Sequence, residues 1–112
     1  MEQFKVEPKG RIWLEIGGNN FLGTGREELL EKIEELGSLR KAAITMGMSY
    51  RKAYYAIRSI NKLASAPLVI FTKGGKGGGN AMITPSGKNY MNLFRQFEKN
   101  FEIFLSEQAK KV

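Results

Sequence analysis

Residues 38–63 read SLRKAAITMGMSYRKAYYAIRSINKL, and this stretch decides the fold. Ser38 and Ser49 each precede a segment with apolar residues at helical spacing, which is typical of a helix N-cap. Gly47 lies between the two segments, where glycine readily adopts the positive φ of a tight turn. The stretch therefore predicts two short helices, about three residues apart, that form a helix-turn-helix.

The chain before this motif predicts a β-hairpin and one helix. Residues 11–16 alternate apolar and polar side chains, which indicates a strand, and residues 17–20 read as a turn before a short return strand at 21–22. Thr24 and Glu27 have the spacing of a capping box, so a helix is expected from Thr24. Its glutamates are expected to form a solvated outer face; they are Glu27, Glu28, Glu31, Glu34 and Glu35.

The chain after the motif predicts a strand at 68–72, a glycine-rich loop at 73–80, a second strand at 81–84 and a long helix at 85–107. Strand, loop and strand after a helix-turn-helix is the order of a winged helix. We therefore expect an α+β fold, mainly α: a winged helix-turn-helix with an N-terminal hairpin and a long C-terminal helix. The 112 residues are expected to form one domain, with residues 1–23 as the hairpin, 24–84 as the winged unit and 85–112 as a dimerisation helix.

Positive charge is concentrated in the middle of the chain. The net charge is +7, and residues 38–91 carry nine Lys and Arg with no acidic residue. Residues 1–37 carry five cations against eight glutamates, a net charge of −3. Such segregation is typical of a polyanion binder, and we favour nucleic acid over a merely basic protein.

The composition excludes several classes of function. The chain has no Cys, no His and no Asp, so a zinc or haem site, a Ser-His-Asp triad and a disulfide framework cannot be built. We expect no enzyme activity, no metal and no cofactor. No apolar run approaches a membrane span, and the expected location is the cytoplasm, in association with the nucleoid.

The second helix of the motif carries the candidate reading face. Arg and Lys suit guanine edges and phosphates, and the first turns of a recognition helix reach the bases. We expect DNA contact from Ser49, Tyr50, Arg51, Lys52, Tyr55 and Arg58. Tyr54 is expected to be a half-buried structural ring. The alternative is a solvated basic face without a ligand.

The glycine-rich loop is the candidate wing. It lacks the Gly-Lys-Ser/Thr ending of a phosphate-binding P-loop, so a nucleotide site is disfavoured. We expect contact with the DNA backbone from the wing and from one helix N-cap, through Ser38, Lys73, Gly75, Lys76 and Gly77. The alternative is a hairpin end that makes no contact.

Large aromatic residues repeat along the last helix at steps of four and three, as in a coiled-coil seam. They are Tyr90, Phe94, Phe97, Phe101 and Phe104. We expect the same helix of a second chain to cover them, which gives a homodimer. Packing onto the chain's own hairpin and first helix is the alternative, and both could apply to different rings.

These motifs resemble the N-terminal domain of ModE-type, molybdate-responsive transcription regulators of prokaryotes. The resemblance rests on Gly37-Ser38-Leu39, on residues 47–53 (GMSYRKA), on the wing sequence at 74–81 and on Thr84-Pro85-Ser86-Gly87. The helix-turn-helix is also similar to that of LysR-type regulators. The resemblance implies a winged helix, dimerisation through the long helices and binding to palindromic operator DNA. The molybdate-binding domain of that family has no counterpart in these residues, so a stand-alone form is expected and no ligand residue is carried over.

The sequence thus predicts a homodimeric regulator that binds double-stranded DNA sequence-specifically, with any small-molecule effector unknown. Two alternatives remain open. One is an architectural, chromatin-type protein that binds duplex DNA without sequence preference. The other is a small oxyanion-responsive sensor that uses the glycine loop.

Overall fold

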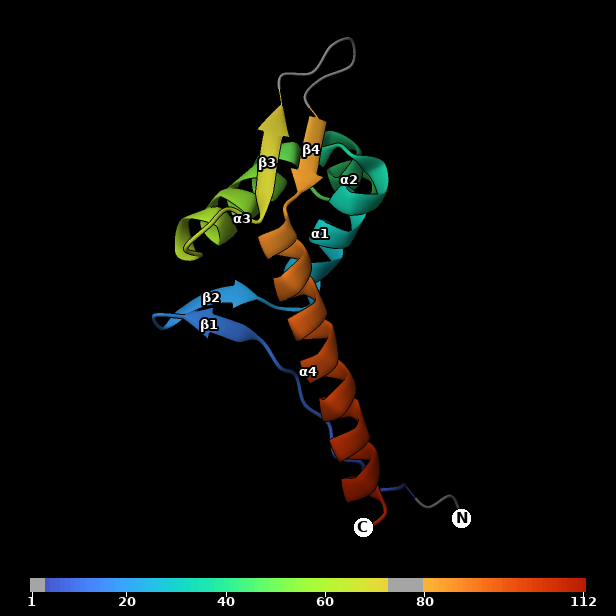
Figure 1. The fold of residues 1–112 in the computed structure, drawn as a ribbon. Coiled ribbons are helices and arrows are strands. Elements are labelled where there is room, and N and C mark those ends of the chain that lie inside the picture. The colour runs from blue at the N-terminus through green and yellow to red at the C-terminus, as the bar shows by residue number, and fades with distance from the viewer. Residues whose placement is uncertain (1–3, 73–79) are drawn as a thin grey trace.

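The computed structural model describes residues 4–72 and 80–112 (Figure 1). In these residues it has four helices and two antiparallel hairpins, so the predicted mainly helical α+β class is confirmed. In chain order the elements are β1 (Leu14–Ile16), β2 (Asn19–Leu22), α1 (Thr24–Leu36), α2 (Leu39–Thr45), α3 (Tyr50–Leu63), β3 (Val69–Thr72), β4 (Asn80–Ile83) and α4 (Pro85–Ala109).

The N-terminal hairpin follows the predicted alternation. Leu14 and Ile16 face the core while Trp13 and Glu15 are exposed, and the Trp13 indole N–H donates to Glu15 at 2.9 Å. The strand itself is shorter than the predicted 11–16, because its first residue, Leu14, pairs with Leu22, the last residue of β2. The register shifts between Leu14 and Glu15, and a bulge of this kind bends the strand.

The capping box predicted for α1 is wrong. The N-cap residue is Gly23, which has no side chain to cap with, and Thr24 is already helical. The Thr24 hydroxyl donates instead to Glu98 of α4 at 3.2 Å, and Glu27 is buried against α4. Both side chains thus join α1 to α4, a long-range contact that sequence spacing does not reveal.

The pair α2–α3 begins and ends where the sequence predicts. Ser38 accepts from the Lys41 N–H at 3.2 Å, and Ser49 accepts from the Lys52 N–H at 3.1 Å. Between the helices, Gly47 has φ 66°, and the Met48 N–H donates to the carbonyl of Ala43 at 3.0 Å. This is the closing bond of a Schellman turn, which ends α2 and turns the chain into α3.

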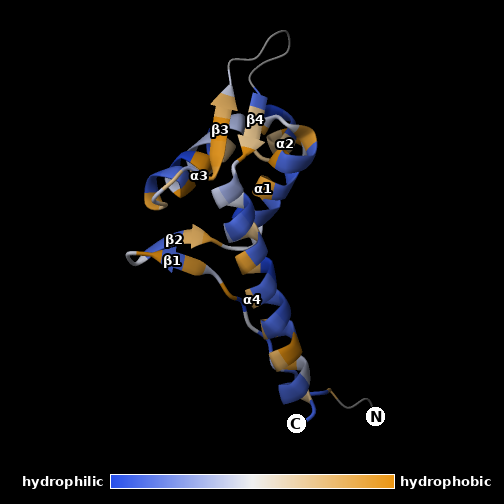
Figure 2. Ribbon diagram, in the orientation of Figure 1, coloured by the Kyte–Doolittle hydropathy of each residue, from blue (hydrophilic) through white to orange (hydrophobic). Residues whose placement is uncertain are grey.

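The core lies where α1, α2 and α3 meet β2, β3 and the first turns of α4. Figure 2 shows β3 coloured mostly as apolar, whereas β4 is paler and hydrophilic at its start. Ala42, Ala43 and Ala53 are all buried, and their small side chains let α2 and α3 approach closely. None of the four described helices has both the length and the hydropathy needed to cross a bilayer.

The helix α4 projects from the core as a long arm (Figure 1). Thr84 caps it by accepting from the Gly87 N–H at 3.0 Å, and a Cβ on Gly87 would overlap the carbonyl oxygen of Leu68. Twenty-five residues give a length of ~37 Å. The radius of gyration is 17.2 Å, whereas a compact chain of this length would have ~13 Å. Much of α4 therefore lies outside the core of its own chain.

Candidate nucleic-acid interface

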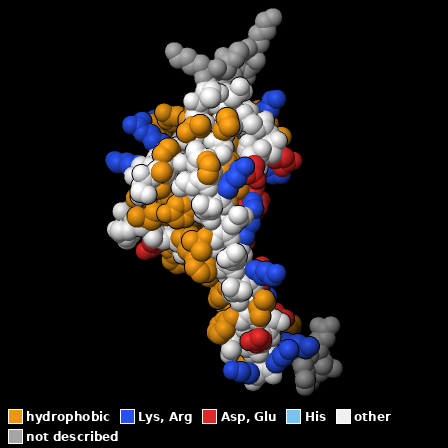
Figure 3. All heavy atoms as spheres, in the orientation of Figure 1, with side chains coloured by type: hydrophobic (Ala, Val, Ile, Leu, Met, Phe, Trp, Pro, Cys, Tyr) orange, Lys and Arg blue, Asp and Glu red, His pale blue; other side chains and the backbone are white. Residues whose placement is uncertain are grey.

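The outer face of α3 carries exposed cations and a tyrosine. Arg51, Tyr55, Arg58 and Lys62 follow at steps of four and three residues, and all four are exposed, while the opposite face is buried in the core. The Arg51 guanidinium lies 5.6 Å from the centre of the Tyr55 ring, a cation–π contact that holds both side chains on this face. In Figure 3 the charged side chains visible over α3 are Lys and Arg.

The N-terminal end of α3 adds partial positive charge to this face. Tyr50, Arg51 and Lys52 form its first turn and are exposed, and no acidic residue lies in that turn. The first N–H groups of a helix and its dipole favour an anion at this end. The Ser49 hydroxyl is used by the helix itself, because it caps Lys52, and Ser38 has the same role at α2. In this structure the two serine hydroxyls therefore cap their own helices.

Aromatic rings connect α3 to the β3–β4 hairpin. Tyr54 packs on Tyr50 with ring centres 6.3 Å apart and on Phe71 of β3 at the same distance. Tyr54 is 38% exposed, in agreement with the half-buried ring that the sequence predicts, and Phe71 is 46% exposed. The sequence does not reveal Phe71 as a surface residue, because residues 68–72 read as one continuous apolar strand. The rings make α3 and the hairpin one continuous surface.

Asn61 fixes the start of β3 against the end of α3. Its side-chain amide donates to the Val69 carbonyl at 2.8 Å, and its Oδ1 accepts from the Leu68 and Val69 N–H groups at 2.9 and 3.2 Å. Sequence reasoning missed this residue, because an asparagine near a helix end has many possible partners. Asn61 sets where the hairpin stands relative to α3.

The predicted wing residues Lys73, Gly75, Lys76 and Gly77 lie outside the described residues. The hairpin that leads to them is described: β3 and β4 pair in register, with Thr72 opposite Asn80 at its open end. The oxyanion-sensor alternative also depends on the glycine loop, so it stays an untested expectation.

Two of the five acidic residues of α1 form ion pairs with α4. Arg95 contacts Glu27 at 2.9 Å and Glu31 at 2.9 Å, and Glu27 is only 5% exposed. The prediction that all five glutamates form a solvated face is therefore wrong for Glu27. Burial raises the pKa of the Glu27 carboxyl to about 7; the charge of Glu31 adds to this rise, and Arg95 opposes it.

The aromatic seam of α4 is divided between core and surface. Phe94 is fully buried in its own chain, and Tyr90 packs edge-on against Phe21 with ring centres 5.0 Å apart. The assignment of Phe94 to a dimer interface is thereby corrected, because it has no surface left for a partner. Phe101 is partly covered by the N-terminal segment at Gly10.

A shorter apolar stripe remains exposed along α4. Leu93, Phe97 and Phe104 are 39%, 45% and 52% exposed, and their spacing places them on one side of the helix. Sequence reasoning missed Leu93, because the regular aromatic spacing favoured its neighbour Phe94. We call Leu93, Phe97 and Phe104 the α4 stripe.

The described residues contain no group of three acidic, His or Cys side chains that could hold a metal ion. No family model matches the sequence. Among curated proteins, the chain is 32% identical to the molybdenum transport protein ModE of Azotobacter vinelandii, over 91% of this chain and 38% of that protein. It is 33% identical to the DNA-binding transcriptional dual regulator ModE of Escherichia coli K12, over 88% and 39% respectively.

The chain is a homologue of the N-terminal region of ModE regulators. It is also 34% identical to the molybdenum-pterin-binding protein MopB of Rhodobacter capsulatus, over 81% of this chain and 34% of that protein. The chain thus spans between a third and two-fifths of the length of these relatives. Their names describe regulators and molybdenum-related binding or transport proteins rather than enzymes, in agreement with the expectation from composition.

Proposed function

We propose that the chain is a sequence-specific, double-stranded-DNA-binding transcription regulator of the ModE type. The observation that carries the proposal is the α3 face: three cations and a tyrosine stand exposed along one side of a helix whose other side is buried. No carboxylate occurs between Leu36 and Phe97, so no acidic side chain of this segment opposes a phosphate backbone. The name of the Escherichia coli relative supports the same function.

In this proposal α2 and α3 form a helix-turn-helix, and the β3–β4 hairpin is the wing. The first turns of α3 enter the major groove, where Arg51 and Lys52 read base edges and Tyr55 and Arg58 contact bases or phosphates. The helix N-termini after Ser38 and Ser49 face phosphates. Lys73 and Lys76 of the wing would add backbone contacts, and residues 24–84 would form the DNA-binding unit.

We further propose that α4 makes a homodimer. The α4 stripe lies on the arm that projects beyond the core, and an apolar stripe of this size on a monomer is a typical interaction surface. The same helix of a second chain, packed across a two-fold axis, would cover both stripes at once. Two α3 helices placed ~34–36 Å apart would then reach successive major grooves of a palindromic site.

Selection of bound sequences from a pool of random DNA duplexes tests this function. We expect enrichment of an inverted repeat with half-sites about one helical turn apart. Retention of the pool without enrichment would instead identify an architectural protein that binds duplex DNA through charge alone. A failure to retain any duplex at 0.1 M salt would refute the DNA-binding proposal.

A further inference from the structure

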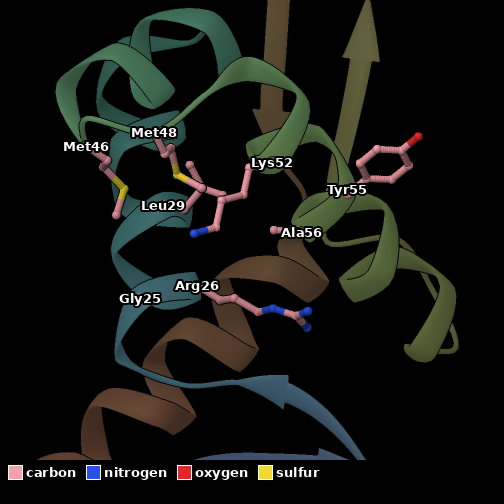
Figure 4. Close-up of a pocket in the computed structure, with 8 residues that line it drawn as sticks. All are labelled: Gly25, Arg26, Leu29, Met46, Met48, Lys52, Tyr55 and Ala56. Atoms are coloured by element: carbon pink, nitrogen blue, oxygen red, sulfur yellow. The ribbon is translucent and has the colours of Figure 1, made fainter.

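A cavity of about 440 Å³ lies beside the reading face, between the start of α1, the α2–α3 turn and α3. Figure 4 shows Leu29 rising from α1 and the two methionines, Met46 and Met48, descending from the turn to the same space. Ala56 lines it from α3. Its volume falls in the ~300–1,000 Å³ range of small-molecule sites and is about three times the ~150 Å³ of an apolar cavity that holds benzene.

The wall of this cavity suits an apolar group. Leu29, Met46, Met48 and Ala56 supply aliphatic and thioether surface, and unbranched methionines adapt their shape to different ligands. Met46 and Met48 stand on either side of Gly47, the residue that forms the turn. A ligand on the methionines would therefore contact the segment that joins α2 to α3.

Among the described residues, the only charged side chains lining the cavity are cations. The guanidinium of Arg26 is already engaged, because it donates to the carbonyls of Asn20 and Phe21 at 2.9 and 3.2 Å. The Lys52 ammonium is different: Figure 4 shows its side chain extending from α3 into the space beside Leu29, and within the described residues it donates no hydrogen bond. The cavity thus combines an apolar wall with one available ammonium and no lining carboxylate.

We propose that this cavity binds a small amphipathic organic anion, an apolar ring or chain that bears one carboxylate. The ring packs on Leu29 and the methionines, and the carboxylate pairs with the Lys52 ammonium. The regulatory consequence rests on the proposed DNA-binding function: Lys52 and Tyr55 belong to the face that contacts DNA, so an occupied cavity withdraws Lys52 from the duplex. The ligand then lowers the affinity for DNA.

The test uses 2-naphthoate as the anionic probe and 2-naphthamide as its neutral isostere, with binding followed by NMR titration of the full chain. We expect saturable binding of 2-naphthoate, with shifts at Leu29, Met46, Met48 and Ala56, and about tenfold weaker binding of 2-naphthamide. Lys52→Gln should weaken 2-naphthoate about tenfold and leave 2-naphthamide unchanged. Lys99→Gln, the same exchange at an exposed position of α4, is the matched control and should change neither.

Absence of saturation by 5 mM, equal affinity for the two probes, or shifts remote from the cavity would overturn the site. Ala56→Leu, which fills the cavity from α3, should abolish binding of both probes, and retained affinity in that variant would also overturn it. A separate titration measures duplex affinity with and without saturating 2-naphthoate. Unchanged duplex affinity at saturation would overturn the regulatory role alone, whereas a chain that binds 2-naphthoate but no duplex would refute the proposed function and leave the site standing.

Discussion

Replacing Asn61 with alanine tests how the hairpin is held against α3. The substitution removes three hydrogen bonds, one to the Val69 carbonyl and two from the Leu68 and Val69 N–H groups. Leu68 and Val69 are 0% and 1% exposed, so water cannot readily replace the lost partner. A net contribution of ~0.5–1.5 kcal/mol per bond, with an added penalty for buried unpaired groups, predicts a loss of about 2–4 kcal/mol in unfolding free energy.

Urea unfolding at one fixed protein concentration measures this loss, because a dimer's stability depends on concentration. The matched control is Asn89→Ala, an exposed asparagine on α4, which should change the unfolding free energy by less than ~0.5 kcal/mol. We also expect Asn61→Ala to weaken duplex binding, because the wing loses its fixed position beside α3. A stability loss of Asn61→Ala no larger than that of the control would refute the reasoning.

Three further predictions address charge, assembly and base reading. Because the pKa of Glu27 is about 7 in the folded chain and near 4.5 when unfolded, wild-type unfolding free energy should fall by ~3 kcal/mol as pH rises from 4.5 through 7. Glu27→Gln should lack this fall. If the wild type and Glu27→Gln lose the same unfolding free energy between these pH values in urea unfolding, the raised pKa does not belong to Glu27. Phe97→Glu should give a monomer in sedimentation, because it places a charge in the α4 stripe. The control Ser106→Glu lies on the opposite side of α4 and should stay a dimer. A dimeric Phe97→Glu would exclude the α4 stripe as the interface. Arg51→Ala should relax selection at one base position per half-site, at a cost of ~1–3 kcal/mol, and an unchanged selected sequence would remove Arg51 from base reading.

Local signals in the sequence were sufficient for most of the fold. The two serine caps and Gly47 placed α2, α3 and their turn correctly, because each of these features acts within a few residues. Thr84 and the proline after it likewise placed the start of α4. The alternation before Ile16 predicted which side chains of the first hairpin face the core.

Features that depend on distant partners were missed or wrong. Glu27 has the spacing of a capping residue, yet it forms a partly buried ion pair with Arg95, 68 residues away. In the sequence Asn61 is an ordinary polar helix residue, and only the folded structure shows that it bonds to Leu68 and Val69. Phe94 continues the aromatic spacing of α4, but the helix lies on the core at that point, so the ring turns inward and Leu93 becomes the exposed neighbour.

The sequence predicted which residues share the exposed side of α3, but not what each of their side chains contacts. The period of α3 placed Arg51, Tyr55 and Arg58 together on the surface, as expected from their spacing. The environment of each side chain was not predictable, because it depends on other elements. Lys52 extends into a cavity formed with α1, and Tyr54 packs on a strand residue.

The salt dependence of duplex affinity tests the central claim most directly. If each subunit neutralises ~3–5 phosphates through α3, the helix N-termini and the wing, a dimer should give a slope of about −5 to −9 for log affinity against log salt concentration. Lys and Arg on the α3 face are the described source of this slope. A slope near zero for the dimeric chain would contradict the account, because it would show that the exposed cations of α3 do not contact phosphates.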